Sequence, residues 1–265
     1  MLKDITIGQY FPGDSMVHRL DPRIKIVLTF VLIISLFIAS NFKGYGICAL
    51  FVLVQLVLSR VPVKHVFKGL RPLLIILLLT IFINMLMVEG KVIYSLGPFG
   101  ITREGLMQAG RMATRLILLV MGASLLTLTT SPIALTDGIE KLLNPFRRLG
   151  LPAHELAMMM TIALRFIPTL LDETDRIMKA QMARGADFES GNLLRRAKNL
   201  VPLLVPLFIS AFRRADELAL AMESRCYRGG EGRTRLKVLR MAGMDYFALT
   251  LGGLVLVTTI VSRGW

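Results

Sequence analysis

The chain has 265 residues, of which 54% are hydrophobic, and it carries a formal net charge of +14. Such an apolar composition excludes an ordinary soluble globular protein and indicates that lipid forms part of the solvent. The positive charge must then be concentrated in particular segments, and their location should report the orientation of the chain in a membrane.

The N-terminal 23 residues mix polar and apolar side chains and lack the pattern of a cleavable signal peptide. The first apolar run is therefore expected to stay in the protein. Cys48 lies in an apolar run and Cys226 in a basic stretch, so a disulfide between them is not expected.

Five apolar stretches are predicted to span the membrane. Each is shorter than the roughly 20 residues that a hydrocarbon layer of ~30 Å requires, so flanking turns must complete each crossing. The stretches are Ile26 to Ser40, Gly46 to Leu58, Leu73 to Val88, Leu116 to Thr130, and Phe247 to Val261.

Basic residues crowd one connection, between the second and third stretches, which is therefore expected to face the cytoplasm. They are Arg60, Lys64, Lys68 and Arg71. Counting crossings from this loop places the N-terminus and residues 131–243 in the cytoplasm and the C-terminus outside. The sequence thus predicts a membrane domain at 1–130, a cytoplasmic domain at 131–243 and a last transmembrane helix at 244–265.

Residues 131–243 contain more than half of the Lys and Arg residues and two thirds of the Asp and Glu residues. Helix caps and breaks divide this segment: Ser131 followed by Pro132 starts a helix, and glycines at 150, 185 and 191 mark breaks. Three helices are predicted, near 132–148, 153–184 and 192–225. The second and third begin apolar and end charged, as expected of helices that lie against a membrane and reach a soluble partner.

The second and third helices also end alike, in a faint repeat with an offset of 41 residues. Arg184 lies between Ala183 and Gly185, and Arg225 lies between Ser224 and Cys226. One interpretation is that cations favour helix C-termini, an effect worth only about 0.3 to 1 kcal/mol at a surface. The other is that each arginine, with small neighbours, enters a pocket of a partner and binds a carboxylate or helix-end carbonyls.

Several motifs in this order resemble the transmembrane T component of energy-coupling factor vitamin transporters, over nearly the whole chain. They are Tyr10-Phe11-Pro12-Gly13-Asp14-Ser15, His18-Arg19-Leu20-Asp21-Pro22-Arg23, Thr102-Arg103-Glu104-Gly105-Leu106, Leu128-Thr129-Thr130-Ser131-Pro132, Leu164-Arg165-Phe166-Ile167-Pro168, and the run from Ala180 to Gly185. The second arginine motif departs from the family's Ala-Arg-Gly pattern, because it has Ser224 and Cys226.

The resemblance implies an all-helical membrane protein that couples two ATP-binding-cassette ATPase subunits to a membrane-embedded substrate-binding S component. It implies that the two arginine motifs occupy grooves of the ATPases. The residues concerned are Ala183, Arg184, Gly185, Ser224, Arg225 and Cys226. Three consecutive methionines, Met158, Met159 and Met160, either fill gaps in a core or form a deformable surface for the S component.

Other polar residues have simpler expected roles. Asp21 is predicted to cap a helix, with Arg23 and Lys25 at anionic headgroups. Arg111 and Arg115 share a helix face at the start of the fourth span, and they are predicted to reach the outer interface, with contact to a partner as the alternative. Asn84 is expected to form a hydrogen bond between helices.

The motifs of several other protein classes are absent from the sequence. It has no Gly-rich loop ending in Lys-Ser or Lys-Thr, so ATP is expected to bind to partner subunits and the chain itself to need no cofactor. Its three histidines form no metal or nucleophile pattern, and its basic residues form no stripe with stacking aromatics for nucleic acid. A stand-alone secondary transporter and a membrane scaffold or enzyme with a basic lipid- or nucleic-acid-contacting domain remain as alternatives.

Overall fold

A computed structural model describes residues 10–88, 90–96, 99–188, 192, 198–229 and 239–263. The chain divides into two compact units. One comprises residues 8–138 and 237–265, and the other comprises residues 139–236 together with the first seven residues. The first is called here the membrane unit and the second the hairpin unit.

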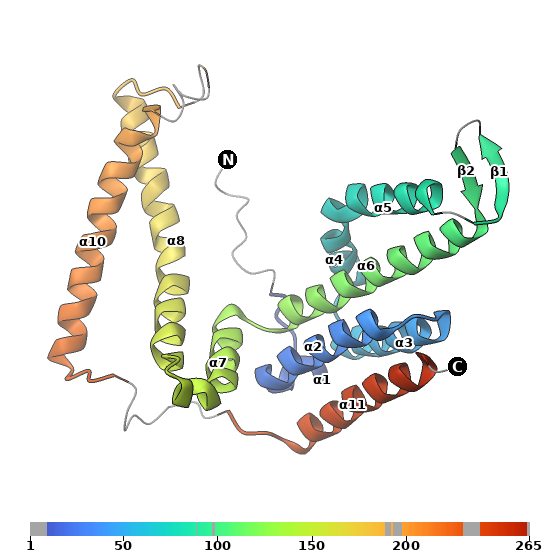
Figure 1. The fold of residues 1–265 in the computed structure, drawn as a ribbon. Helices are drawn as coiled ribbons and strands as arrows, with labels where there is room; N and C mark the ends of the chain where they lie inside the picture. Colours follow the sequence, from blue (N-terminus) through green and yellow to red (C-terminus); the bar gives the residue numbers. More distant parts are fainter. Residues whose placement is uncertain are drawn as a thin grey trace. The chain divides into compact units, whose positions relative to one another are not determined.

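The membrane unit is a bundle of helices with one short β-hairpin (Figure 1). Its helices, including a 3-10 turn η2, are α1 (Met16–Arg19), α2 (Pro22–Ile38), α3 (Phe42–Ser59), α4 (Val63–Leu70), η2 (Arg71–Leu73), α5 (Leu74–Met87), α6 (Arg103–Thr129) and α11 (Gly243–Arg263). The strands β1 (Val92–Leu96) and β2 (Phe99–Thr102) pair antiparallel, with Leu96 opposite Phe99. The expected all-helical membrane fold is confirmed, but the hairpin and the short helices α1 and α4 were not predicted.

The core of the membrane unit forms around α2, which packs against α3, α6 and α11. Buried leucines on one side of α2, Leu28, Leu32 and Leu36, belong to a single cluster with residues of the three neighbouring helices. Two glycines face these leucines: Gly122 of α6 meets Leu32, and Gly252 of α11 meets Leu28. Small residues at helix crossings allow the close backbone approach that membrane helices use for association.

Polar residues join the start of α2 to the start of α11. Asp21 caps α2, accepting a hydrogen bond from the backbone N–H of Arg23, while its own backbone N–H donates to Asp245 Oδ1 over 2.8 Å. Burial raises the pKa of Asp21, but hydrogen bonds from Arg23 outweigh this effect and hold the pKa below its ordinary value. The predicted cap is confirmed.

Arg23 and Lys25 were predicted to meet anionic lipid headgroups, but both bind groups of the protein itself. Arg23 donates to Asp21 Oδ2 and to the carbonyl of Leu239, and Lys25 is buried with Nζ donating to the carbonyls of His18 and Thr129. The carbonyls of His18 and Thr129 lie in the last turns of α1 and α6, where they have no partner within the helix. Both residues therefore bind the protein's own backbone and hold its segments together.

The hairpin unit is built mainly from two long helices, α8 (Ala153–Ala183) and α10 (Val201–Ser224). They are preceded by α7 (Pro132–Leu143), within which the boundary between the units falls, and by a 3-10 segment η3 (Asn144–Leu149). Ser131 Oγ accepts from the N–H of Ala134 and caps α7, and Gly150 has a positive φ of 86° after η3. The helix starts and breaks predicted at these positions are confirmed, whereas the break predicted at Gly191 lies outside the described residues.

Five helical segments of the described chain are long and apolar enough to cross a membrane: Phe42–Ser59, Val63–Met87, Arg103–Thr129, Ala153–Ala183 and Gly243–Arg263. Four of them overlap the second to fifth predicted spans almost completely. The first predicted span is α2, whose 17 residues make it shorter than these five. Ala153–Ala183 was predicted to be cytoplasmic, and its C-terminal half carries Asp172, Glu173, Asp175, Arg176 and Lys179.

Candidate functional site

The C-terminus of α8 ends in a Schellman turn with Arg184 as the capping residue. The N–H of Gly185 donates to the carbonyl of Met182, and the N–H of Ala186 donates to that of Gln181, both over 3.0 Å. This turn requires a left-handed residue after the cap, and Gly185 supplies it with φ 88°. The glycine of the Ala-Arg-Gly motif thus has a backbone role, and Arg184 is exposed at the tip of the helix.

The C-terminus of α10 repeats this turn around Arg225. The N–H of Cys226 donates to the carbonyl of Glu223 over 2.8 Å, and the N–H of Tyr227 donates to that of Met222 over 3.0 Å. Cys226 takes the left-handed position with φ 55°, which non-glycine residues seldom adopt. Ser-Arg-Cys therefore forms the same backbone turn as Ala-Arg-Gly, and Arg225 is exposed in the same way.

The two arginines lie at opposite ends of the hairpin unit. α8 and α10 run antiparallel (Figure 1), and Gln181 Nε2 donates to the carbonyl of Pro202 near the Arg184 end. At the other end the hydroxyl of Tyr227 donates to Met158 Sδ over 3.0 Å. The 26 residues from Met158 to Arg184 correspond to roughly 40 Å at a helical rise of about 1.5 Å per residue. The two exposed arginines are therefore separated by about this distance.

An ion pair in the middle of the unit holds the two helices in this register. Glu173 of α8 accepts from Ser210 Oγ over 2.8 Å and from the guanidinium of Arg214 over 2.7 Å, both of α10. The Arg214 side chain is 38% exposed, so the pair stabilises the contact only modestly. Among the described residues, no ion pair engages Arg184 or Arg225. Both remain accessible to a partner.

The methionine run lies near the Arg225 end of α8. Met158 is half-buried against Tyr227, whereas Met159 and Met160 are 57% and 42% exposed. The gap-filling interpretation is thus wrong for Met159 and Met160. It remains a prediction that the run contacts a substrate-binding subunit.

An apolar surface on α10 was not predicted as a site. Val201, Val205, Phe208 and Phe212 are between 50% and 69% exposed. Their spacing of four, three and four residues places them on one face of the helix. The signal in the sequence was the apolar first half of this helix, but only the position of α8 shows which face remains uncovered.

Three polar side chains in the membrane unit have contacts that bear on the predictions, and of these Asn84 alone binds differently from what was predicted, while the position of Arg111 and Arg115 at the outer interface stays a prediction. Arg111 donates to the carbonyl of Ser40, and Arg115 donates to the carbonyl of Ala39 and to the Tyr45 hydroxyl, the last over 2.9 Å. Both guanidinium groups thus neutralise the negative C-terminal end of α2 and fix its connection to α3. Asn84 donates to the carbonyl of Thr80 within its own helix, not to another helix.

The exposed groups of the hairpin unit equip the chain for binding. Among the described residues, no group of three or more His, Cys, Asp or Glu side chains is arranged to hold a metal ion. What the unit presents is a guanidinium at each end, able to form paired hydrogen bonds to carboxylates, and an apolar face between them.

Comparison with known proteins places these features in a family. The chain matches the family described as cobalt transport protein (CbiQ) over residues 13–236. It is 63% identical to the energy-coupling factor transporter transmembrane protein EcfT of Thermosediminibacter oceani over 262 residues, covering 99% of both chains. The proteins of the same name from Clostridium kluyveri, over 100% of this chain and 99% of the relative, and Bacillus subtilis, over 92% and 93%, are 59% and 51% identical.

Proposed function

Because this chain belongs to the family of energy-coupling factor transporter transmembrane proteins, we propose that it transmits motion from two ATP-hydrolysing subunits to a substrate-binding membrane subunit. The chain is a multi-pass membrane protein and the transmembrane component of such a transporter. In this proposal the partners bind and hydrolyse ATP, and the solute, a vitamin or a metal ion, is held by the substrate-binding subunit.

One observation carries the proposal: two similar backbone turns present one arginine each at opposite ends of an antiparallel helix pair. A separation of roughly 40 Å is large enough for each arginine to engage a different subunit. If the two ATPases approach each other when they bind ATP, both ends of the helix pair must follow. The approach of the ATPases would then change the tilt of the hairpin unit or the crossing angle between α8 and α10.

The arginines suit this task because of their charge and shape. A guanidinium in a groove lined by carboxylates forms paired charged hydrogen bonds that lysine does not reproduce. Small neighbours, Ala183 and Gly185 at one end and Ser224 and Cys226 at the other, allow the wall of a groove to approach closely. Work is transmitted only if the chain binds the two nucleotide states of the ATPases with different affinity, because equal affinities shift no equilibrium.

The apolar face of α10 and the exposed methionines of α8 supply the other contact. We assign this surface, with Met158, Met159 and Met160, to the substrate-binding subunit, whose own surface must be apolar because it lies in the membrane. Flexible methionine side chains accommodate partners of different shape. Movement of the helix pair would then tip the bound subunit and release its solute.

The orientation follows from the distribution of cations. The proposal places the hairpin unit and the basic loop of α4 on the cytoplasmic side of the prokaryotic plasma membrane, as the positive-inside rule requires. α8 has the length and hydropathy of a span, but Arg165 interrupts its apolar half and its last turns are charged. A helix of this kind fits the cytoplasmic interface better than the bilayer interior.

Removal of the arginines tests the proposal. The full transporter complex is purified with Arg184→Ala, Arg225→Ala or both, and retained ATPase subunits and solute uptake are measured. Each single variant is expected to weaken docking by about 2 to 5 kcal/mol, largely because a partner carboxylate is left unpaired. Since the two ends are far apart, each single variant should lose one ATPase subunit and the double variant both.

Arg213→Ala is the matched control, because Arg213 is an exposed arginine in the middle of α10. It should retain both ATPases and normal uptake. Retention of both ATPases together with uptake in the double variant would overturn the coupling proposal. Loss of both subunits from each single variant would contradict the assignment of one subunit to each end.

A further inference from the structure

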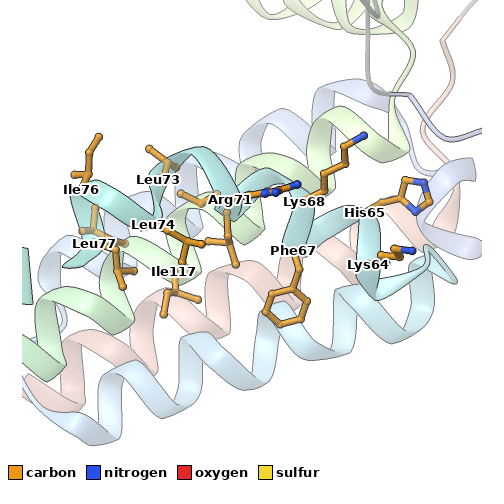
Figure 2. Close-up of a pocket in the computed structure, with 13 residues that line it drawn as sticks. Lys64, His65, Phe67, Lys68, Arg71, Leu73, Leu74, Ile76, Leu77 and Ile117 are labelled. Atoms are coloured by element: carbon orange, nitrogen blue, oxygen red, sulfur yellow. The ribbon is translucent and has the colours of Figure 1, made fainter. Parts of the chain in front are cut away.

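The membrane unit contains a pocket that coupling does not use. Its volume is about 860 Å³, and it lies between α4, η2, α5 and α6 (Figure 2). The side nearer to α4 carries the cations Lys64, Lys68 and Arg71, and the side nearer to α5 carries aliphatic residues that include Leu77 and Ile117. The pocket thus has a basic mouth and an apolar interior.

The basic mouth follows from the amphipathic pattern of α4. Lys64, Lys68 and Arg71 are exposed and spaced at four and three residues, so they lie on one face. The opposite face carries Val66 and Leu70, which are 0% and 9% exposed and belong to the core. A short helix with an apolar face and a cationic face is typical of the membrane interface.

The apolar interior exists because the chain turns between α4 and α5 (Figure 1). The turn contains Pro72, which removes a backbone donor and bends helices. α5 therefore runs in a different direction from α4 and packs along α6 (Figure 1). The turn leaves a pocket between the helices, and Leu116, Ile117 and Val120 of α6 line one side of it.

We propose that this pocket binds one anionic phospholipid, with its phosphate at Lys64, Lys68 and Arg71 and an acyl chain against Leu77 and Ile117. The charge of the pocket complements such a lipid, because none of the described residues that line it is acidic while three are Lys or Arg. Basic pockets beside transmembrane helices bind anionic headgroups, and the volume falls in the ~300 to 1,000 Å³ range of ligand pockets. A transmembrane helix of another protein would cover the leucines but would leave the cations unpaired.

The proposal is independent of the coupling function. The positive-inside rule needs only that the cations lie on the cytoplasmic side, whereas a lipid site needs them next to an apolar pocket. A lipid bound there would fix the corner between α4 and α5, whose outer surface is otherwise uncovered. The residues on this surface include Leu74, Ile75 and Leu78, which are 49%, 77% and 64% exposed.

The test is native mass spectrometry of the full chain in detergent, titrated with phosphatidylglycerol and separately with phosphatidylcholine. The wild-type chain should retain one phosphatidylglycerol in preference to phosphatidylcholine. Because a basic residue near an anionic lipid contributes roughly a fivefold gain in affinity, Lys64→Gln, Lys68→Gln and Arg71→Gln together should weaken binding at least about tenfold. Ile117→Phe, which fills the pocket without a charge change, should also reduce retention.

The matched control removes three exposed cations from elsewhere in the membrane unit by Lys43→Gln, Lys91→Gln and Arg103→Gln. It should bind phosphatidylglycerol as the wild type does. Equal binding of the two lipids by the wild type, or unchanged binding in the triple variant at the pocket, would overturn the proposal. Displacement of the lipid by inorganic phosphate alone would also overturn it, because it would indicate a site for a free anion.

Discussion

At the scale of single residues, the two arginine motifs show how a small sequence difference leaves a backbone turn intact. Gly185 and Cys226 occupy the same left-handed position, at φ 88° and φ 55°. For an L-residue this conformation costs about 1 to 2 kcal/mol, whereas glycine adopts it freely. The departure from Ala-Arg-Gly therefore changes the stability of the turn but not its geometry.

Substitutions at these two positions should therefore have opposite effects on the stability of the chain. Cys226→Gly should stabilise the chain by up to about 1 kcal/mol, the relief of strain less the greater entropy of glycine in the unfolded chain. Gly185→Ala should destabilise it by about 1 kcal/mol for the converse reason. Thermal unfolding of the purified variants measures both. Equal shifts in the same direction would contradict the strain argument.

Several residues show where sequence reasoning stops at this scale. The caps at Asp21 and Ser131 were predictable because their partners lie two or three residues away. Arg115 binds a carbonyl 76 residues away, and Lys25 binds one 104 residues away. Their residue type indicated only a cation near a membrane, since the partner is brought in by helix packing.

At the scale of helices, a close crossing of α5 and α6 explains part of the Thr102-Arg103-Glu104-Gly105-Leu106 motif. Thr102 caps α6 by accepting from the N–H of Gly105, and its hydroxyl donates to the carbonyl of Val88 over 2.6 Å. A Cβ at Gly105 would lie 2.9 Å from the carbonyl oxygen of Asn84 and 3.0 Å from that of Met85. The motif thus lets the end of α5 pack directly on the first turn of α6.

The same substitution at two glycines of α6 should therefore have opposite effects. Gly105→Ala should destabilise the chain by about 1 to 3 kcal/mol, because rigid backbone atoms must move to admit the methyl group. Gly110→Ala meets nothing within 4 Å and should be neutral or stabilise by up to about 1 kcal/mol through helix propensity. Melting temperatures in detergent distinguish them. A stable Gly105→Ala variant would contradict the close crossing.

Some helix ends were predicted well at this scale, whereas α10 begins at Val201 instead of near 192, α6 begins at Arg103 instead of near 116, and the pairing of helices was not predicted. Pro, Ser and Gly signals act locally, so the starts near 132 and 153 and the break at Gly185 follow from neighbouring residues. The 41-residue repeat indicated two similar helix ends but not that they lie at opposite ends of an antiparallel pair. That arrangement depends on contacts such as Glu173 with Arg214, which no local signal specifies. The β1–β2 hairpin was missed because its strands are only five and four residues long.

At the scale of the whole molecule, the charge distribution predicts which side of the membrane each segment faces. The two native cysteines allow this orientation to be tested. Cys48 is buried at 0% exposure in the core of the membrane unit, whereas Cys226 is exposed in the Arg225 turn. The sequence contains only these two cysteines. A thiol reagent that does not cross membranes should therefore report on Cys226 alone, without engineered residues.

The proposed orientation predicts labelling from one side only. A membrane-impermeant maleimide should modify the chain in inside-out vesicles but not in sealed cells, because the hairpin unit is assigned to the cytoplasm. Cys226→Ser should abolish the signal, which identifies the labelled residue. Because Cys226 flanks Arg225, a docked ATPase subunit should also slow the reaction, and the Arg225→Ala variant should restore it. Labelling in sealed cells would place the hairpin unit outside and contradict both the orientation and the docking of ATPases at this turn.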